Sequence, residues 1–109
     1  MMYEMETIRE TVILVAVDTE GQERTERSLD ELSELARTAG ANVAGRLIQS
    51  RESVHPATYI GKGKLLELKD LIWEMDATGI ICDDELTSAQ MKALEEELSC
   101  KIIDRTLLI

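Results

Sequence analysis

The residues of this chain best suited to bind an anion lie together in one loop, Pro56–Lys64, with the sequence PATYIGKGK. The loop contains the only proline of the chain, two of its six glycines and two lysines. Glycine lets a backbone approach a ligand closely, and free amides at the start of a helix attract negative charge. The pattern therefore indicates a phosphate-binding site, for a nucleotide or for RNA. The alternative is a flexible helix start whose lysines are simply solvated.

This candidate site lies in the one basic part of an acidic chain. Residues 41–70 contain five Lys/Arg and three Asp/Glu, whereas the whole chain has a net charge of −10. Such acidity argues against a domain that coats nucleic acid but allows one focused contact. If residues Tyr59–Lys64 make that contact, we expect them to be exposed and mobile without their partner. The residues assigned to the candidate site are Tyr59, Gly61, Lys62, Gly63, Lys64 and, near the end of the chain, Arg105.

The loop differs from the phosphate-binding loop of nucleoside triphosphatases. The motif G-x-x-x-x-G-K-[ST] occurs nowhere in the chain, and Lys64 is followed by a leucine where that motif has a hydroxyl residue. We therefore predict that this chain performs no catalysis by itself and holds no cofactor.

A second group of residues with potential chemistry is the acidic run Asp83-Asp84-Glu85, which follows a short apolar stretch. Carboxylates in such a run could hold Mg²⁺ together with water molecules, and Asp83 and Asp84 are the candidate ligands. The alternative is a solvated loop whose negative charge favours the positive end of the following helix.

Three single residues have simpler interpretations. His55 is the only histidine and has no obvious nucleophile partner, so we expect it in a surface loop. Trp73 lies beside apolar residues, and we expect it to pack in the core. Arg105 could form an ion pair with the adjacent Asp104 or bind an anion, and the sequence does not decide between these roles.

The elements that must position these residues follow from the apolar pattern. Capping-box pairs, Ser28 with Glu31 and Thr87 with Gln90, predict the starts of two helices, and leucines at helical spacing predict another between them. Short apolar or β-branched runs predict strands, the second of them near a sheet edge. The predicted strands are 11–17, 42–49, 79–82 and 100–104, and the predicted helices are 29–39, 65–75 and 88–98.

The order β-α-β-α-β-α-β predicts an α/β fold, a small four-stranded parallel sheet flanked by three helices. We expect the strand order 2-1-3-4. Ligands of open parallel sheets bind outside the carboxyl ends of the strands, where the loops 50–64 and 83–88 would lie.

No segment of the chain predicts a membrane protein. The longest apolar run, Val12–Val17, is too short for a membrane span, and the acidic N-terminus is unlike a signal peptide. Cys82 and Cys100 lack a metal-ligand spacing and lie in apolar runs, as free cysteines do. These features predict a cytoplasmic protein. The final segment, Arg105–Ile109, is mostly apolar and lacks a polar tail, so we expect the chain to be part of a longer protein.

Several short motifs occur in a specific order. They are P-x-T-Y-I-G-K-G-K at 56–64, D-D-E-L at 83–86 with Gln90 after it, Leu94-Glu95, and I-D-R-T at 103–106 followed by Leu108 and Ile109. Together they resemble the N-terminal domain of the HflX family of GTP-binding proteins. The resemblance implies an acidic extension at 1–10 and an α/β domain at 11–109. In the family, a helical segment and a Ras-like GTPase domain follow this domain.

The resemblance also implies a function. Members of this family bind the large ribosomal subunit, and several separate stalled or stressed ribosomes into subunits. The chain would then dock on ribosomal RNA and regulate its own GTPase domain, which would bind GTP and Mg²⁺. Some members bind ATP through the N-terminal region, for which Tyr59–Lys64 is the best candidate here.

Two rival hypotheses remain at this stage. One is a nucleotide-binding sensor that holds phosphates at Gly61–Lys64 and a metal at Asp83–Glu85. The other is a protein-interaction domain that uses an edge strand.

Overall fold

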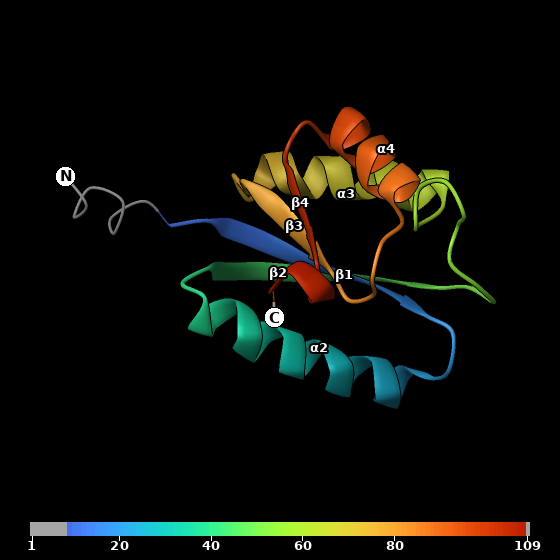
Figure 1. Cartoon of the computed structure of the whole chain (residues 1–109), viewed down its shortest axis with the longest axis horizontal. Helices are drawn as coiled ribbons and strands as arrows, with labels where there is room; N and C mark the ends of the chain where they lie inside the picture. The colour runs from blue at the N-terminus through green and yellow to red at the C-terminus, as the bar shows by residue number, and fades with distance from the viewer. Residues whose placement is uncertain (1–8, 109) are drawn as a thin grey trace.

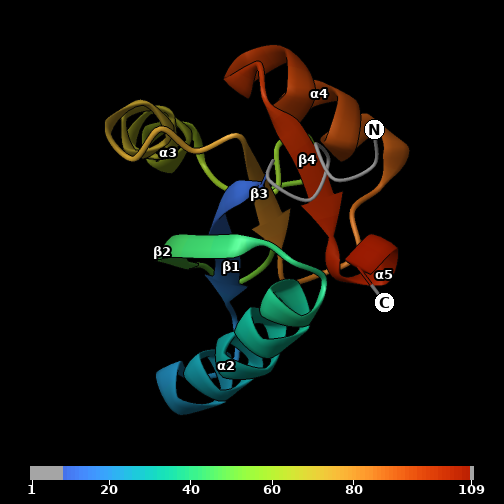
Figure 2. The ribbon, with the colours of Figure 1, turned by 90° about the vertical axis from the view of Figure 1, so that its left-hand side faces the viewer.

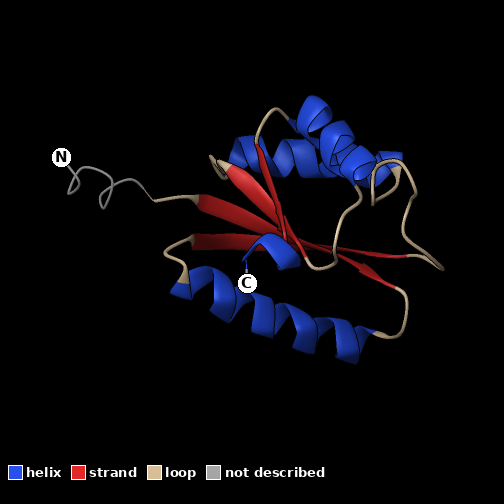
Figure 3. Cartoon of the chain, in the orientation of Figure 1, coloured by secondary structure: helices blue, strands red, loops and turns tan. Residues whose placement is uncertain are grey.

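The computed structural model describes residues 9–108 and shows a sheet with helices on both faces (Figure 1). Strands and helices alternate along the chain, and the sheet forms the middle layer (Figure 3). The predicted α/β class is therefore confirmed. The strands are β1 Thr11–Asp18, β2 Asn42–Ser50, β3 Gly79–Cys82 and β4 Lys101–Asp104, and the helices are α2 Gln22–Thr38, α3 Lys62–Glu74, α4 Ser88–Leu98 and α5 Arg105–Leu108.

The four strands are parallel and lie in the order β2-β1-β3-β4, which confirms the predicted order. β1 is one of the two inner strands and pairs with β2 along its whole length. Its residues Val12 to Val17 are all buried because helices cover both faces of the sheet. β2 lies at one edge, as predicted.

Successive side chains of β1 enter two separate apolar cores. Val12, Leu14 and Ala16 pack with apolar residues of α2, whereas Ile13, Val15 and Val17 pack with residues of α3 and α4. This alternation follows from the period of two in a strand. Figure 2 shows the result, with α2 on one face of the sheet and with α3 and α4 on the other.

Helix α2 begins earlier than predicted, because its N-cap is Gly21 and Ser28 lies inside the helix. The first turns are polar, so they carry no apolar periodicity that the sequence could reveal. They are stabilised instead by ion pairs at i,i+4 spacing, such as Arg27 with Glu23 at 3.3 Å. Asp18 Oδ1 also accepts a hydrogen bond from the Gly21 amide at 2.8 Å, which fixes the entry into the helix.

Two predictions near other helices are wrong. Trp73 is 84% exposed, because α3 turns Leu65 and Leu68 toward the sheet and Trp73 away from it. The final segment, for which the sequence predicted no helix, forms a short fourth helix, α5. There, Asp104 Oδ1 accepts a hydrogen bond from the Leu107 amide at 2.9 Å.

The start of α4 agrees with its prediction. Thr87 Oγ1 accepts from the Gln90 amide at 3.0 Å, and Gln90 Oε1 accepts from the Thr87 amide at 2.9 Å, which completes the capping box. Within residues 9–108, no helix combines the length and the apolar character required to cross a membrane.

We predict that Gly79→Ala destabilises the fold by about 1–3 kcal/mol, because a β-carbon at this position would lie 2.8 Å from the carbonyl oxygen of Lys101 on the neighbouring strand. Gly63→Ala is the matched control, since a β-carbon there meets nothing within 4 Å. In helix α3 it should be neutral or stabilising by up to about 1 kcal/mol. Urea unfolding of both variants checks the prediction, and equal stabilities would contradict it.

Candidate functional site

The strand order creates a crevice between the carboxyl ends of β1 and β3. From β1 the chain proceeds to β2 on one side, while β3 lies on the other side, and ligands of open α/β sheets bind at such a reversal. A cleft of about 210 Å³ is found there, which we call the switch-point cleft. It is lined by Val17, Thr19, Glu20, Arg24, Thr25, Ser28, Asp83 and Asp84.

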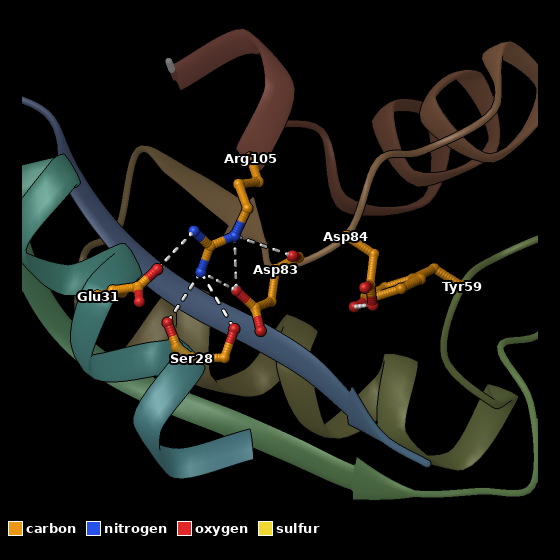
Figure 4. A network of polar contacts seen from close by, with 6 residues as sticks. All are labelled: Ser28, Glu31, Tyr59, Asp83, Asp84 and Arg105. Atoms are coloured by element: carbon orange, nitrogen blue, oxygen red, sulfur yellow. Dashed lines mark hydrogen bonds and ion pairs between the residues drawn. The ribbon is translucent and has the colours of Figure 1, made fainter. Parts of the chain in front are cut away.

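Arg105, at the start of α5, connects three elements beside this cleft (Figure 4). Its Nη2 donates to Asp83 Oδ1 at 2.8 Å and to the Ser28 carbonyl oxygen at 2.9 Å. Its Nε donates to Asp83 Oδ1 at 3.2 Å, and its Nη1 donates to Glu31 Oε1 at 3.4 Å. All three guanidinium nitrogens therefore have acceptors within the chain, and they hold α5 against α2 and the end of β3.

The partner of Arg105 is Asp83, so the ion pair with Asp104 that the sequence left open is not formed. In the sheet, Cys82 of β3 lies opposite Asp104 of β4, which places the next residues, Asp83 and Arg105, side by side. Asp104 is buried and accepts instead from the Leu86 amide at 2.9 Å. The pairing thus depends on strand register, which no local sequence pattern records.

Tyr59 lies inside the protein, in the core that the sheet forms with α3 and α4. Only 1% of its surface is exposed, and its hydroxyl donates to Asp84 Oδ2 at 2.6 Å. The backbone φ of Tyr59 is +69°, a conformation that costs a bulky residue about 1–3 kcal/mol. The expectation of an exposed loop is wrong for Tyr59, Ile60 and Gly61, all of which are buried, because the tyrosine ring fills the core below α3 and α4.

The turn before Tyr59 is organised by His55. Its Nδ1 accepts hydrogen bonds from the amides of Ala57 at 3.1 Å and Thr58 at 3.3 Å. The backbone of His55 pairs with that of Tyr59, and the His55 carbonyl oxygen accepts from Gln90 Nε2 at 2.8 Å. The histidine therefore has a structural role in the loop, and it joins the loop to the start of α4.

The remaining residues of the predicted anion site surround the start of α3. Lys62 and Gly63 are exposed, while Lys64 Nζ pairs with Glu67 at 3.2 Å. The Gly61 amide is not free for a ligand, because it donates to Gln49 Oε1 at 2.8 Å. These residues do not line the switch-point cleft, so the structure separates them from Arg105.

Gln49 and Arg51 belong to this region although the sequence interpretation did not select them. A β-carbon on Gly61 would lie 3.0 Å from Arg51 Nη1 and 3.2 Å from Gln49 Nε2, so both side chains crowd against Gly61. The sequence could have indicated them by their position at the end of β2, because ligands of parallel sheets bind outside the carboxyl ends of the strands. Arg51, Lys62 and Lys64 together form a group of cations that we call the basic corner.

The chemistry that the switch-point cleft can perform is limited by its own internal bonds. Asp83 is paired with Arg105, and Asp84 accepts from Tyr59. Across residues 9–108, no group of three or more histidine, cysteine, aspartate or glutamate side chains is arranged to hold a metal ion. Both carboxylates thus have structural roles.

Buried groups around this cleft resist ionisation. Burial, followed by the hydrogen bond to Asp84, raises the pKa of Tyr59 far above its ordinary value. Burial likewise raises the pKa of the Cys82 thiol, and nearby carboxylates, Asp104 first, add to the shift. Both cysteines are free, and Cys100 is half-buried with a pKa raised by the same cause.

Comparison with known proteins gives a consistent result. Residues 26–109 match the family described as GTP-binding GTPase N-terminal. The chain is 56% identical over 108 residues to GTPase HflX of Lacrimispora saccharolytica, covering 99% of this chain and 26% of that protein. It is 47% identical to GTPase HflX of Caldanaerobacter subterraneus subsp. tengcongensis, covering 99% of this chain and 25% of the relative. For GTPase HflX of Escherichia coli, the identity is 32% over 88 residues, 81% of this chain and 21% of the relative.

The chain spans about a quarter of the length of the curated relatives that it matches best in this comparison.

We predict that the stability of the protein falls in alkaline solution and that Tyr59 contributes to this fall. Because its pKa is higher in the folded than in the unfolded chain, its contribution is complete below the unfolded value of about 10 and decreases as the pH rises above it. Cys82 should contribute in the same direction from about pH 8.5 upward.

Tyr59→Phe should lower stability at pH 7 by about 1 kcal/mol through the lost hydrogen bond, and should flatten the decline above pH 10. Urea unfolding from pH 7 to 11 measures both effects, and parallel curves for the two proteins would contradict the assignment.

We predict that Arg105→Ala destabilises the domain by about 2–3 kcal/mol, because Asp83, whose side chain is only 10% exposed, loses its partner. Arg105→Lys should give an intermediate loss, since an ammonium cannot bond several acceptors in one plane. Arg27→Ala removes an ion pair whose side chains are 71% and 90% exposed, and should cost less than about 0.5 kcal/mol. A loss at Arg105 no larger than that at Arg27 in chemical unfolding would refute the structural role.

Proposed function

This chain belongs to the HflX family of GTPases as its N-terminal domain, and from this premise we propose that it is a docking and regulatory module for the large ribosomal subunit. The domain would hold the GTPase part of the longer protein on the subunit, in the cytoplasm, during ribosome splitting or rescue under stress. GTP and Mg²⁺ would be bound by the GTPase part, and this chain would perform no catalysis by itself.

The observation that supports docking on RNA is the basic corner. Arg51, Lys62 and Lys64 surround the first turn of α3 in a chain whose net charge is −10. Ribosomal RNA presents phosphates at high density. A few cations on an otherwise acidic surface therefore favour binding of the domain in one orientation over nonspecific binding. The amides at the start of α3 add partial positive charge.

The features of the switch-point cleft support a structural and regulatory role. Its two aspartates are already bonded to Arg105 and Tyr59, and the motif for binding a triphosphate is missing from the sequence. Arg105 fixes α5, the last described element, to the body of the domain. In a longer protein this contact would set the direction in which the chain leaves the domain.

The alternative, a nucleotide sensor at Gly61–Lys64, has less support. A nucleotide phosphate held by this loop would need its backbone amides, and the Gly61 amide is already bonded to Gln49 at 2.8 Å. In the part of the chain that the structure describes, no group of three or more histidine, cysteine, aspartate or glutamate side chains could hold a metal ion beside that loop.

We predict that Lys62→Glu/Lys64→Glu in the full-length protein weakens binding to purified large subunits by at least about tenfold at moderate salt, because two phosphate contacts become repulsive. Thermal stability should change little, since Lys62 is exposed and the Lys64 pair lies at the surface. Arg27→Glu/Lys92→Glu, with the same change of charge at two other exposed residues, should bind normally. Pelleting of the variants with large subunits measures the effect.

A second form of the protein tests the domain as a whole. If a full-length protein that lacks residues 1–109 pelleted with large subunits equally well, in the same nucleotide-dependent manner, the docking proposal would be refuted.

A further inference from the structure

Two adjacent aspartates after β3 bond to residues from distant parts of the chain. Asp84 Oδ2 accepts from the Tyr59 hydroxyl at 2.6 Å, whereas Asp83 Oδ1 accepts from Arg105 Nη2 at 2.8 Å. Figure 4 shows the two pairs, with Tyr59 beside Asp84 and Arg105 beside Asp83. Because one planar peptide unit joins the two aspartates, a movement of either carboxylate acts on the other over a single residue.

A second pair of contacts repeats this pattern in the segment 83–90, which we call the β3–α4 segment. Gln90 Nε2 donates to the His55 carbonyl oxygen at 2.8 Å, in the turn before Tyr59. The Leu86 amide donates to Asp104 Oδ2 at 2.9 Å, just before α5. Gln90 and Asp104 are both buried, so little water competes for these bonds. The β3–α4 segment therefore contacts both regions twice.

The turn formed by residues 55–59, which we call the Tyr59 turn, contains backbone strain. Its last residue, Tyr59, has a φ of +69° although it is a bulky residue. Strained residues keep their conformation only where the surrounding structure holds them, and they are frequent in segments that switch. Here the restraints are the buried ring, two backbone hydrogen bonds with His55 at 2.9 and 3.0 Å, and the hydrogen bond to Asp84. Loss of one restraint should thus favour opening of the turn.

We propose that the β3–α4 segment couples the Tyr59 turn to Arg105, so that the turn and α5 open together in one step short of complete unfolding. The coupling is reciprocal, since whatever loosens one end must loosen the other by the same factor. Its meaning for the longer protein rests on the proposed docking. Gly61 and Lys62 follow Tyr59 almost directly, so RNA bound at the basic corner would act on the turn and would change how firmly α5 is held.

The coupling should be modest in size. Asp83 is partly buried, whereas Asp84 is exposed, so water competes for part of the network. Contacts that share one network are usually coupled, and we expect opening at one end to favour opening at the other by about three- to tenfold. A shift of this size changes how often α5 is released while the rest of the domain stays folded.

Hydrogen exchange of the 109-residue chain, followed by NMR, tests the coupling from both ends. The Tyr59 amide, bonded to the His55 carbonyl oxygen, reports on the turn, and the Arg105 Nε proton, bonded to Asp83, reports on α5. Relative to their intrinsic rates, both protons should exchange faster than the amides of β1, which report complete unfolding. Arg105→Lys should accelerate exchange of the Tyr59 amide about three- to tenfold, and Tyr59→Phe should accelerate exchange of the Arg105 Nε proton by a similar factor.

A control makes the test specific. Arg27→Ala removes an exposed ion pair of α2 and should leave both reporter protons unchanged. The proposal would be overturned if Arg105→Lys did not affect the Tyr59 amide, or if Arg27→Ala accelerated both protons equally well. It would also be overturned if both reporters exchanged only as slowly as the β1 amides, because the two ends would then open only with the whole fold.

Ribosome pelleting is a separate measurement, so the two proposals can fail independently. Loss of docking with these exchange effects intact would refute docking alone, whereas normal docking without them would refute the coupling alone.

Discussion

The handedness of the connections between parallel strands determines most of this structure. Because these crossovers are right-handed, the direction in which the chain moves across the sheet determines which face the connecting helix covers. The chain moves one way from β1 to β2 and the other way from β2 to β3 and β4, so α2 lies on one face while α3 and α4 lie on the other. The same reversal opens the crevice between the carboxyl ends of β1 and β3, where the polar network assembles.

One consequence is that helices cover the two faces of the sheet unequally. Two helices protect one face, whereas α2 protects the opposite face with help only from the short α5, whose Leu108 packs against that core. Arg105 holds α5 there through Ser28 and Asp83. A residue that resembles an anion ligand in sequence is thus bonded within the fold, whereas Lys62 at the start of α3 is exposed.

The sequence predicted the fold well because β1 and β3 are apolar runs buried on both faces, and because the Thr87–Gln90 capping box is a local pattern with a local structure. It did not predict the early turns of α2, which are held by surface ion pairs without apolar periodicity. It also misplaced Trp73, whose apolar neighbours Leu71 and Ile72 face the core while the indole does not.

The candidate site was predictable only in part. The loop at Tyr59–Lys64 was found from its composition, but the burial of Tyr59 depends on a left-handed backbone and on a hydrogen bond to a residue 25 positions away. The pairing of Arg105 with Asp83 depends on strand register. Composition shows which residues could do chemistry, whereas register and burial determine which of them are already engaged within the protein.

The Arg105 contact with Ser28 joins residues 77 positions apart. A chain is made from its N-terminus, and domains generally fold as units during synthesis. Helix α2 is therefore synthesised long before the guanidinium that later bonds to its Ser28. The domain can close its polar network only after residue 105 has been synthesised, so this contact belongs to the last step of its folding.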